Sequence, residues 1–252
     1  MTTAPALFTH AVRMILHDPA TTLRVLMPGI LLIIASSFGI AHFMPEALLS
    51  PVITPDQMQD ISAADAGAML LSGLAGIAGY VVLAVFWHRH VLLMGDARET
   101  ALFPGMGVMG GYLWRVILVA LIQTAAALPI VAVSGIVATV APVVFAGLVA
   151  SVLFFWIALR VSLILPAAAM GRALKIGESW EATAPMSAQI WGLALILGVL
   201  SSIFAIVLGQ LGSAQSTAGL WFQTLSFLVE GLISVSILTT LYGHLVEGRP
   251  LG

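Results

Sequence analysis

The chain has 252 residues, of which 60% are hydrophobic and only 8% are charged, and its mean hydropathy is +1.10. A soluble domain carries about 25% charged residues, so this composition excludes a soluble globular enzyme and a disordered chain. The pI of about 6.3 and the lack of a basic stretch exclude a nucleic-acid-binding protein, and the absence of cysteine excludes disulfides and thiolate chemistry.

The first predicted element is an amphipathic helix over residues 1–19. Thr3 can cap it, and Pro5 suits its first turn. Between Ala6 and His17, Phe8, Val12 and Ile15 form an apolar face of the helix. His10, Arg13 and His17 form a basic face. We therefore expect an interfacial helix that is separate from the first span. The alternative is a frayed extension of that span.

Six segments then match the length of about 20 apolar residues that a bilayer core of about 30 Å requires. They run over Thr21–Phe43, Ala63–Trp87, Tyr112–Val133, Thr139–Pro166, Ile190–Leu211 and Leu220–Leu245. The turn between the third and fourth is the least defined, with Pro129, Ser134–Gly135 and Pro142 as candidates. The first span is expected to be retained, because a long segment precedes its apolar core and is unlike the short basic start of a signal peptide.

The sequence thus predicts an all-α fold, a polytopic membrane helical bundle of six transmembrane helices with short cytoplasmic interfacial helices. It forms one transmembrane domain over residues 1–252, with the bundle itself over 20–248. Two connections, Gly105–Gly111 and Gly171–Pro185, are expected to contain short interfacial elements. Ser62 and Asp65 have the spacing of a capping box at the start of the second span.

Basic residues lie on only one side of the six predicted spans. The nine are Arg13, Arg24, Arg89, Arg98, Arg115, Arg160, Arg172, Lys175 and Arg249. The other three connections carry none, and the longest of them, residues 44–62, is acidic. Because cytoplasmic loops are enriched in Lys and Arg, we expect both termini in the cytoplasm.

Small residues predict where helices pack closely. Gly73, Gly76 and Gly79 recur along the second span, and Gly192, Gly198, Ser201 and Ser202 lie in the fifth. Because small residues let helix backbones approach one another in lipid, we expect these faces to be packing surfaces.

Three polar residues inside the predicted spans form the candidate intramembrane polar site. Glu230 lies near the middle of the last span and Gln123 lies at a similar depth in the third. A carboxylate at this depth is costly, so we expect Glu230 to face the bundle interior with a hydrogen bond at the depth of Gln123. Arg160 lies near the inner face, where it can extend to the lipid phosphates or turn towards Glu230.

No reactive or metal-binding constellation is evident. His88, His90 and His244 lie at the inner ends of their spans, but i and i+2 residues do not share a helix face and no HExxH motif is present. No GxSxG or phosphate-binding loop occurs. We therefore predict no catalytic, cofactor-binding or metal-binding residues and no cofactor.

Two stretches carry a family resemblance. They are Phe86-Trp87-His88-Arg89-His90-Val91-Leu92-Leu93-Met94-Gly95-Asp96 and Arg160-Val161-Ser162-Leu163-Ile164-Leu165-Pro166 with Gly177-Glu178-Ser179-Trp180. The chain resembles bacterial six-helix inner-membrane proteins of the YciC type, which are similar to the membrane domain of some glycerophosphodiester phosphodiesterases. The resemblance implies a bacterial inner-membrane helical protein. It transfers no catalytic residue.

Two functional hypotheses follow. The first is an integral bacterial inner-membrane protein without enzymatic activity that binds membrane lipids or other membrane proteins in an accessory or assembly role. The alternative is a small transporter or channel with an intramembrane polar site around Glu230. A water-filled cavity that reaches Glu230 favours the transporter, and a dry core with an apolar groove favours the binding protein. A membrane-embedded enzyme has the least support, because acids and histidines are not clustered.

Overall fold

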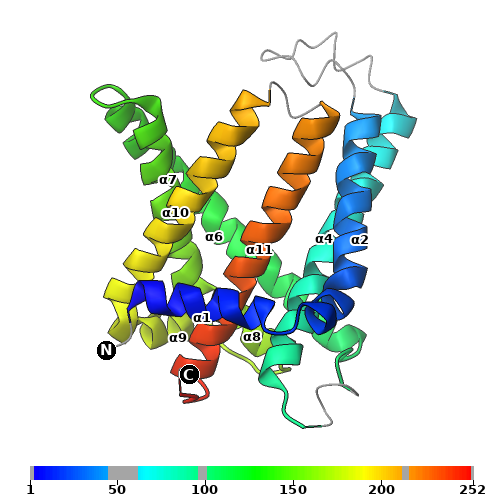
Figure 1. Ribbon diagram of the computed structural model, residues 1–252, viewed down its shortest axis with the longest axis vertical. Coiled ribbons are helices and arrows are strands. Elements are labelled where there is room, and N and C mark those ends of the chain that lie inside the picture. Colours follow the sequence, from blue (N-terminus) through cyan, green and yellow to red (C-terminus); the bar gives the residue numbers. More distant parts are fainter. Residues whose placement is uncertain (1–2, 45–61, 96–100, 212–215, 251–252) are drawn as a thin grey trace.

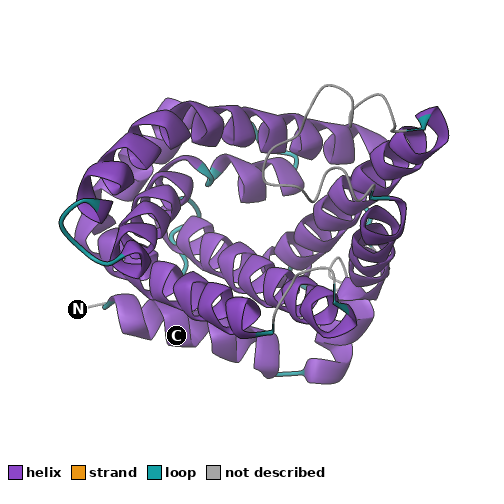
Figure 2. Ribbon diagram, turned by 90° about the horizontal axis from the view of Figure 1, so that it is seen from above, coloured by secondary structure: helices purple, strands orange, loops and turns teal. Residues whose placement is uncertain are grey.

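The computed structural model describes residues 3–44, 62–95, 101–211 and 216–250, and within these ranges every regular element is a helix (Figure 1, Figure 2). The long helices are α2 (Pro19–Phe43), α4 (Ala63–Leu92), α6 (Met106–Ala138), α7 (Val143–Val161), α10 (Ser187–Gln210) and α11 (Thr217–Leu245). The short ones are α1 (Ala4–Leu16), α8 (Ile164–Ala169), α9 (Ile176–Thr183) and a 3₁₀ turn, Ala184–Met186.

Six helical segments are long and apolar enough to cross a membrane, with α9, the 3₁₀ turn and α10 counted together as one segment. The predicted all-α bundle of six candidate spans is therefore confirmed. Only a minority of the residues in the apolar window of each span, between 11% and 44%, are buried inside the protein. Most residues of these windows are thus at least partly exposed, as expected where lipid is the surrounding solvent.

Figure 1 shows the short helices α1, α8 and α9 at one end of the bundle, together with both ends of the chain. We call this the basic end, because every Lys and Arg that the structure describes lies on these helices, in their connections or in the part of a long helix nearest to them. Arg98 lies outside the described residues. The one-sided placement of basic residues, inferred from the order of spans, is thus preserved in three dimensions.

Helices α2 and α4 approach each other through glycines. A Cβ atom at Gly29 would lie 2.6 Å from the Leu83 Cβ and 2.7 Å from the Gly79 carbonyl oxygen. A Cβ at Gly79 would lie 2.9 Å from the Gly29 carbonyl oxygen. Gly76 meets Ser36 in the same interface, whereas a Cβ at Gly73 would meet nothing within 4 Å. Gly76 and Gly79 are therefore packing residues as predicted, and Gly73 is not.

Glycines also bring α10 into close contact with two other helices. A Cβ at Gly198 would lie 2.8 Å from a methyl group of Val152 on α7, and one at Gly192 would lie 2.5 Å from the Ala4 Cβ on α1. Both glycines thus confirm the predicted packing role in the fifth span.

Helix α11 is packed tightly at the basic end and loosely at the other. Every residue from Val235 to Gly243 is buried. Between Thr217 and Val229, only Gly219 and Thr224 are buried. This stretch of α11 lies towards the end of the bundle away from the basic end (Figure 1).

The N-terminal helix is separate from the first span, as predicted, and Figure 1 shows it lying across the long helices. The Thr3 hydroxyl accepts a hydrogen bond from the Ala6 amide, and the Asp18 carboxylate accepts one from the Thr21 amide, so each helix has its own cap. The face that packs on the protein differs from the predicted one. Its buried residues are Ala4, Leu7 and Ala11, while Phe8, Val12 and Ile15 are only half-buried.

The turn between the third and fourth spans lies at residues 139–142, so Pro142 is the correct candidate and Pro129 lies inside α6. Other boundaries also differ from the predicted ones. The second span ends at Leu92 and the third at Ala138, each five residues later than predicted. Residues 106–111 are the first turns of α6 and form no separate element. The fourth span ends at Val161, because α8 follows it as a distinct short helix. The predicted element within 171–185 is confirmed as α9, and Ser62 caps α4 with the predicted Asp65 contact.

The glycine contact between α2 and α4 predicts a sharp difference between two alanine variants. Gly79→Ala pushes a methyl group against backbone and should lower the free energy of unfolding by about 1–3 kcal/mol. Gly73→Ala, two turns away on the same helix, has open space and should not destabilise the protein. Thermal unfolding in one detergent measures both. Equal melting temperatures would contradict the close α2–α4 contact.

Candidate functional site

Glu230 is half-buried on α11, and its carboxyl group contacts the Ser201 hydroxyl of α10. Its Oε1 atom is buried without a hydrogen-bond partner among the described residues. In hydrocarbon a polar group of this kind requires a partner inside the protein. The contact with Ser201 therefore joins the middle of α10 to the middle of α11.

Gln123 lies buried where α6 meets α7. Its Nε2 donates a hydrogen bond to the Phe154 carbonyl oxygen at 3.2 Å, and its own carbonyl oxygen has no partner among the described residues. The structure therefore gives Gln123 a different partner from the Glu230 that its depth suggested.

Arg160, at the end of α7, is buried within a cluster of tryptophans. Its guanidinium carbon lies 4.3 Å from the centre of the Trp180 ring, a cation–π contact. Trp156 stacks on Trp191 with 4.8 Å between ring centres. The chain turns back through α9 and so places Trp180 over Arg160, an arrangement that linear spacing does not reveal.

The three predicted residues consequently belong to three different contacts. Each is assigned its own partner in the described part of the chain, on α10, α7 and α9 respectively. They tie pairs of helices together, and the geometry does not gather them around one shared cavity.

A second polar cluster, centred on His88, joins three helices near the basic end. The His88 ring is fully buried on α4, with Nδ1 2.7 Å from the Thr239 hydroxyl of α11. Since that hydroxyl donates to the Val235 carbonyl, we assign the ring proton to Nδ1, which donates to it. This leaves Nε2 to accept from the Tyr112 hydroxyl of α6 at 3.4 Å.

Arginines at the basic end bind backbone carbonyl groups of other elements. Arg89 donates to the Ala169 carbonyl, at the end of α8, and to the Ala101 carbonyl. Arg249 donates to the Leu92 carbonyl, at the end of α4, at 2.6 Å. The last carbonyls of a helix have no partner within it, so these side chains complete the helix ends.

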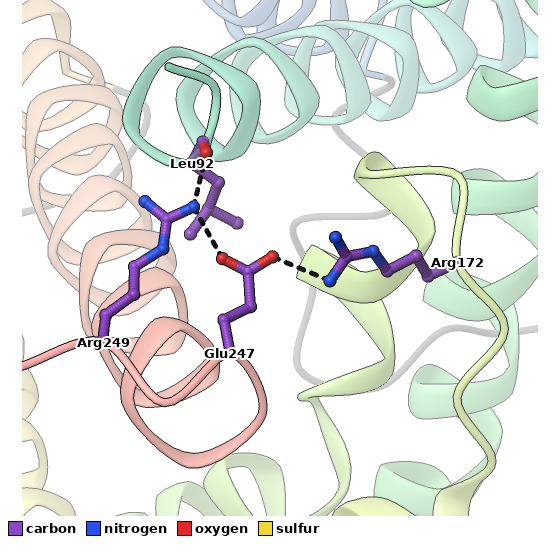
Figure 3. A network of polar contacts seen from close by, with 4 residues as sticks. All are labelled: Leu92, Arg172, Glu247 and Arg249. Atoms are coloured by element: carbon purple, nitrogen blue, oxygen red, sulfur yellow. Dashed lines mark hydrogen bonds and ion pairs between the residues drawn. The ribbon is translucent and has the colours of Figure 1, made fainter.

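Glu247 completes this network, as Figure 3 shows. Its carboxylate oxygens lie 2.9 Å from Nη1 of Arg172 and 2.7 Å from Nη2 of Arg249. The network thereby connects the segment after α11 with the end of α4 and with the loop between α8 and α9. The carboxylate of Glu247 thus lies between two arginines, and these contacts hold the elements of the basic end in fixed positions relative to one another.

A groove opens at the opposite end, between α2, α4 and α11. Its volume is about 530 Å³, and we call it the apolar groove. Its lining residues are Ile33, Ser36, Ser37, Ile40, Ala41, Met44, Gly76, Leu220, Gln223, Thr224 and Phe227.

The polar residues of the apolar groove are largely satisfied within their own helices. The Ser37 hydroxyl donates to the Ile33 carbonyl, and the Thr224 hydroxyl donates to the Leu220 carbonyl. The wall therefore presents mainly hydrocarbon. Glu230 is not among the described residues that line it. The sequence did not predict this groove, because it depends on how α2, α4 and α11 are placed relative to one another.

Histidines at the basic end have separate roles. The His88 ring is held by Thr239, and the His244 Nδ1 lies 3.0 Å from the Arg249 carbonyl. Within the described ranges, no group of three His, Asp or Glu side chains is placed to hold a metal ion.

No family model, no curated protein and no solved structure matches the chain. Functional inference therefore depends on the geometry of these sites.

The contact between Ser201 and Glu230 predicts an energetic coupling. In a double-mutant cycle of Ser201→Ala and Glu230→Leu, we expect a coupling of about 0.6 kcal/mol, the mean for interhelical hydrogen bonds in a membrane. Ser202→Ala is the matched control, because the Ser202 hydroxyl donates to the Gly198 carbonyl of its own helix. Unfolding in detergent gives the four free energies. A coupling that is absent with Ser201, or equally large with Ser202, would refute the pairing.

Proposed function

We propose that this chain is an integral protein of the bacterial inner membrane that acts by binding membrane lipid and catalyses no reaction. The observation that carries the proposal is the apolar groove. It lies among three candidate spans, its volume of about 530 Å³ falls in the range of small-molecule sites, and hydrocarbon lines most of it. An occupant with a long apolar part suits such a wall, and an acyl chain is the apolar group that a membrane supplies.

The transporter alternative has less support. The candidate polar residues do not share a cavity, and the groove passes Phe227 without including Glu230 among its described lining. An apolar groove that does not include Glu230 in its described lining is the arrangement expected of the binding protein. A role in accessory assembly with other membrane proteins is compatible with the same groove.

Lipid binding in the apolar groove can be tested by photo-crosslinking with a phospholipid that carries a diazirine on its acyl chain. Crosslinks should map to α2 and α11 near Ile40 and Thr224. Ile40→Trp should reduce them by filling the groove. Leu71→Trp, at a side chain that is 68% exposed and does not line the groove, is the control. Labelling spread evenly over all helices, or unchanged in Ile40→Trp, would argue against the groove as a lipid site.

We further propose that the basic end faces the cytoplasm, with both termini there. This follows from the one-sided placement of Lys and Arg and from the positive-inside rule.

A reporter that is active only in the cytoplasm should be active when fused to the C-terminus. A reporter active only outside the cytoplasm should be active when inserted between Thr54 and Asp60, a segment that lies outside the described residues. The opposite pattern at either position would overturn the orientation.

A further inference from the structure

A second groove lies at the basic end, where α1 crosses the start of α2 and the end of α4. It consists of two adjoining cavities of about 660 and 420 Å³, and Met14, His17 and His90 line both. The first continues along the start of α2, and the second continues along α1. We call the two together the basic groove.

Positive side chains are concentrated in the basic groove. Arg24 lines the first cavity and Arg13 the second, and His10 is added to the second. Both arginines are exposed. The groove therefore presents two permanent positive charges and imidazole groups from two helices.

Asp18 is the one acidic side chain among the described lining residues. Hydrogen bonds from the hydroxyl and the amide of Thr21 lower the pKa of its carboxyl group, so it is ionised at neutral pH. These hydrogen bonds cap α2 and use the acceptors of Asp18 locally. One carboxylate does not neutralise two arginines, so the described lining of the groove carries a net positive charge.

Neither arginine of the groove has an acceptor in the part of the chain that the structure describes. The ion pairs there involve Arg172 and Arg249, and the carbonyl-bound guanidinium groups belong to Arg89, Arg115 and Arg249. The guanidinium donors of Arg13 and Arg24 therefore bind no acceptor among the described residues. A guanidinium fork matches the oxygen spacing of carboxylate and phosphate groups.

The walls of the basic groove are held in place without an occupant. The Ser236 hydroxyl of α11 donates to the Ala11 carbonyl of α1, and the Thr22 hydroxyl of α2 donates to the Ile15 carbonyl. The close approach of Ala4 to Gly192 fixes the other end of α1. A site whose walls are fixed in advance loses little conformational entropy when a ligand binds.

The position of the groove indicates the source of its ligand. It lies at the ends of two candidate spans, the depth at which a bilayer has its headgroups. Trp87, Val91 and Leu102 add apolar walls beside the charges. Charge and hydrocarbon side by side are the two features that an anionic phospholipid presents at this depth.

From these observations we propose that the basic groove binds an anionic phosphate group between Arg13 and Arg24, carried by a phospholipid headgroup or present as free phosphate. The site is at the other end of the bundle from the apolar groove. The two proposals can therefore fail independently.

The test uses the full chain purified in detergent. Melting temperature is followed against inorganic phosphate, with chloride as the control at equal ionic strength, and then against phosphatidylglycerol and phosphatidylcholine in mixed micelles. We expect saturable stabilisation by phosphate or by phosphatidylglycerol. In Arg13→Gln/Arg24→Gln the half-saturating concentration should rise about tenfold or more, as loss of charge-assisted hydrogen bonds predicts. Arg115→Gln removes the same charge from the same end outside the groove and should leave it unchanged.

The outcomes separate the two sources. Stabilisation by phosphatidylglycerol that far exceeds that by phosphate, with little effect of phosphatidylcholine, assigns the site to a lipid headgroup. Stabilisation by phosphate alone assigns it to the free ion. Absence of both, or an equal loss in Arg115→Gln, overturns the proposal. If the double variant does not fold, His17→Glu at an exposed position must weaken binding in the same way, while Ile40→Trp in the apolar groove must not.

Discussion

The packing of the basic end depends on one interaction, the hydrogen bond from a guanidinium group to the last carbonyl of another helix. Arg89 donates in this way to the end of α8, and Arg249 donates to the end of α4. Each such hydrogen bond satisfies a charge and an unpaired helix end at once. The same side chains consequently hold α4, α8 and α11 in register, and this end becomes the firmly packed one.

Small residues determine which long helices pack closely against each other. Glycines bring α2 against α4 and α7 against α10, so the long helices form closely packed pairs. Helix α11 is enclosed only from Val235 to Gly243, where Ser236 binds α1 and Thr239 binds His88. Beyond that stretch few of its residues are buried, and the apolar groove lies there between α11, α2 and α4. The groove is thus found where α11 is loosely packed, away from the basic end.

Sequence reasoning reached features set by composition and by short spacings. Hydropathy located six candidate spans, and the spacing of Ser62 and Asp65 predicted the cap of α4. The order of the basic residues along the chain predicted that they lie at one end of the bundle. It could not reach features that depend on how helices lean or turn back. The buried face of α1 was misassigned, because Ala4 and Ala11 are small and have little weight in an apolar pattern, yet they allow contact with α10 and α11. The partner of Arg160 was missed, because α9 had to fold back to bring Trp180 over it.

The distance between the two grooves limits what a single ligand can occupy. A phospholipid occupies one leaflet, about half of the bilayer core of about 30 Å, whereas the grooves lie at opposite ends of helices that cross the whole core. One lipid molecule is therefore too short to fill both. Between them lies the contact of Glu230 with Ser201, which joins the middle of α10 to the middle of α11. A change in that contact should alter the width of the apolar groove before it disturbs the basic groove, because α1 and the carbonyl-bound arginines hold the basic end independently.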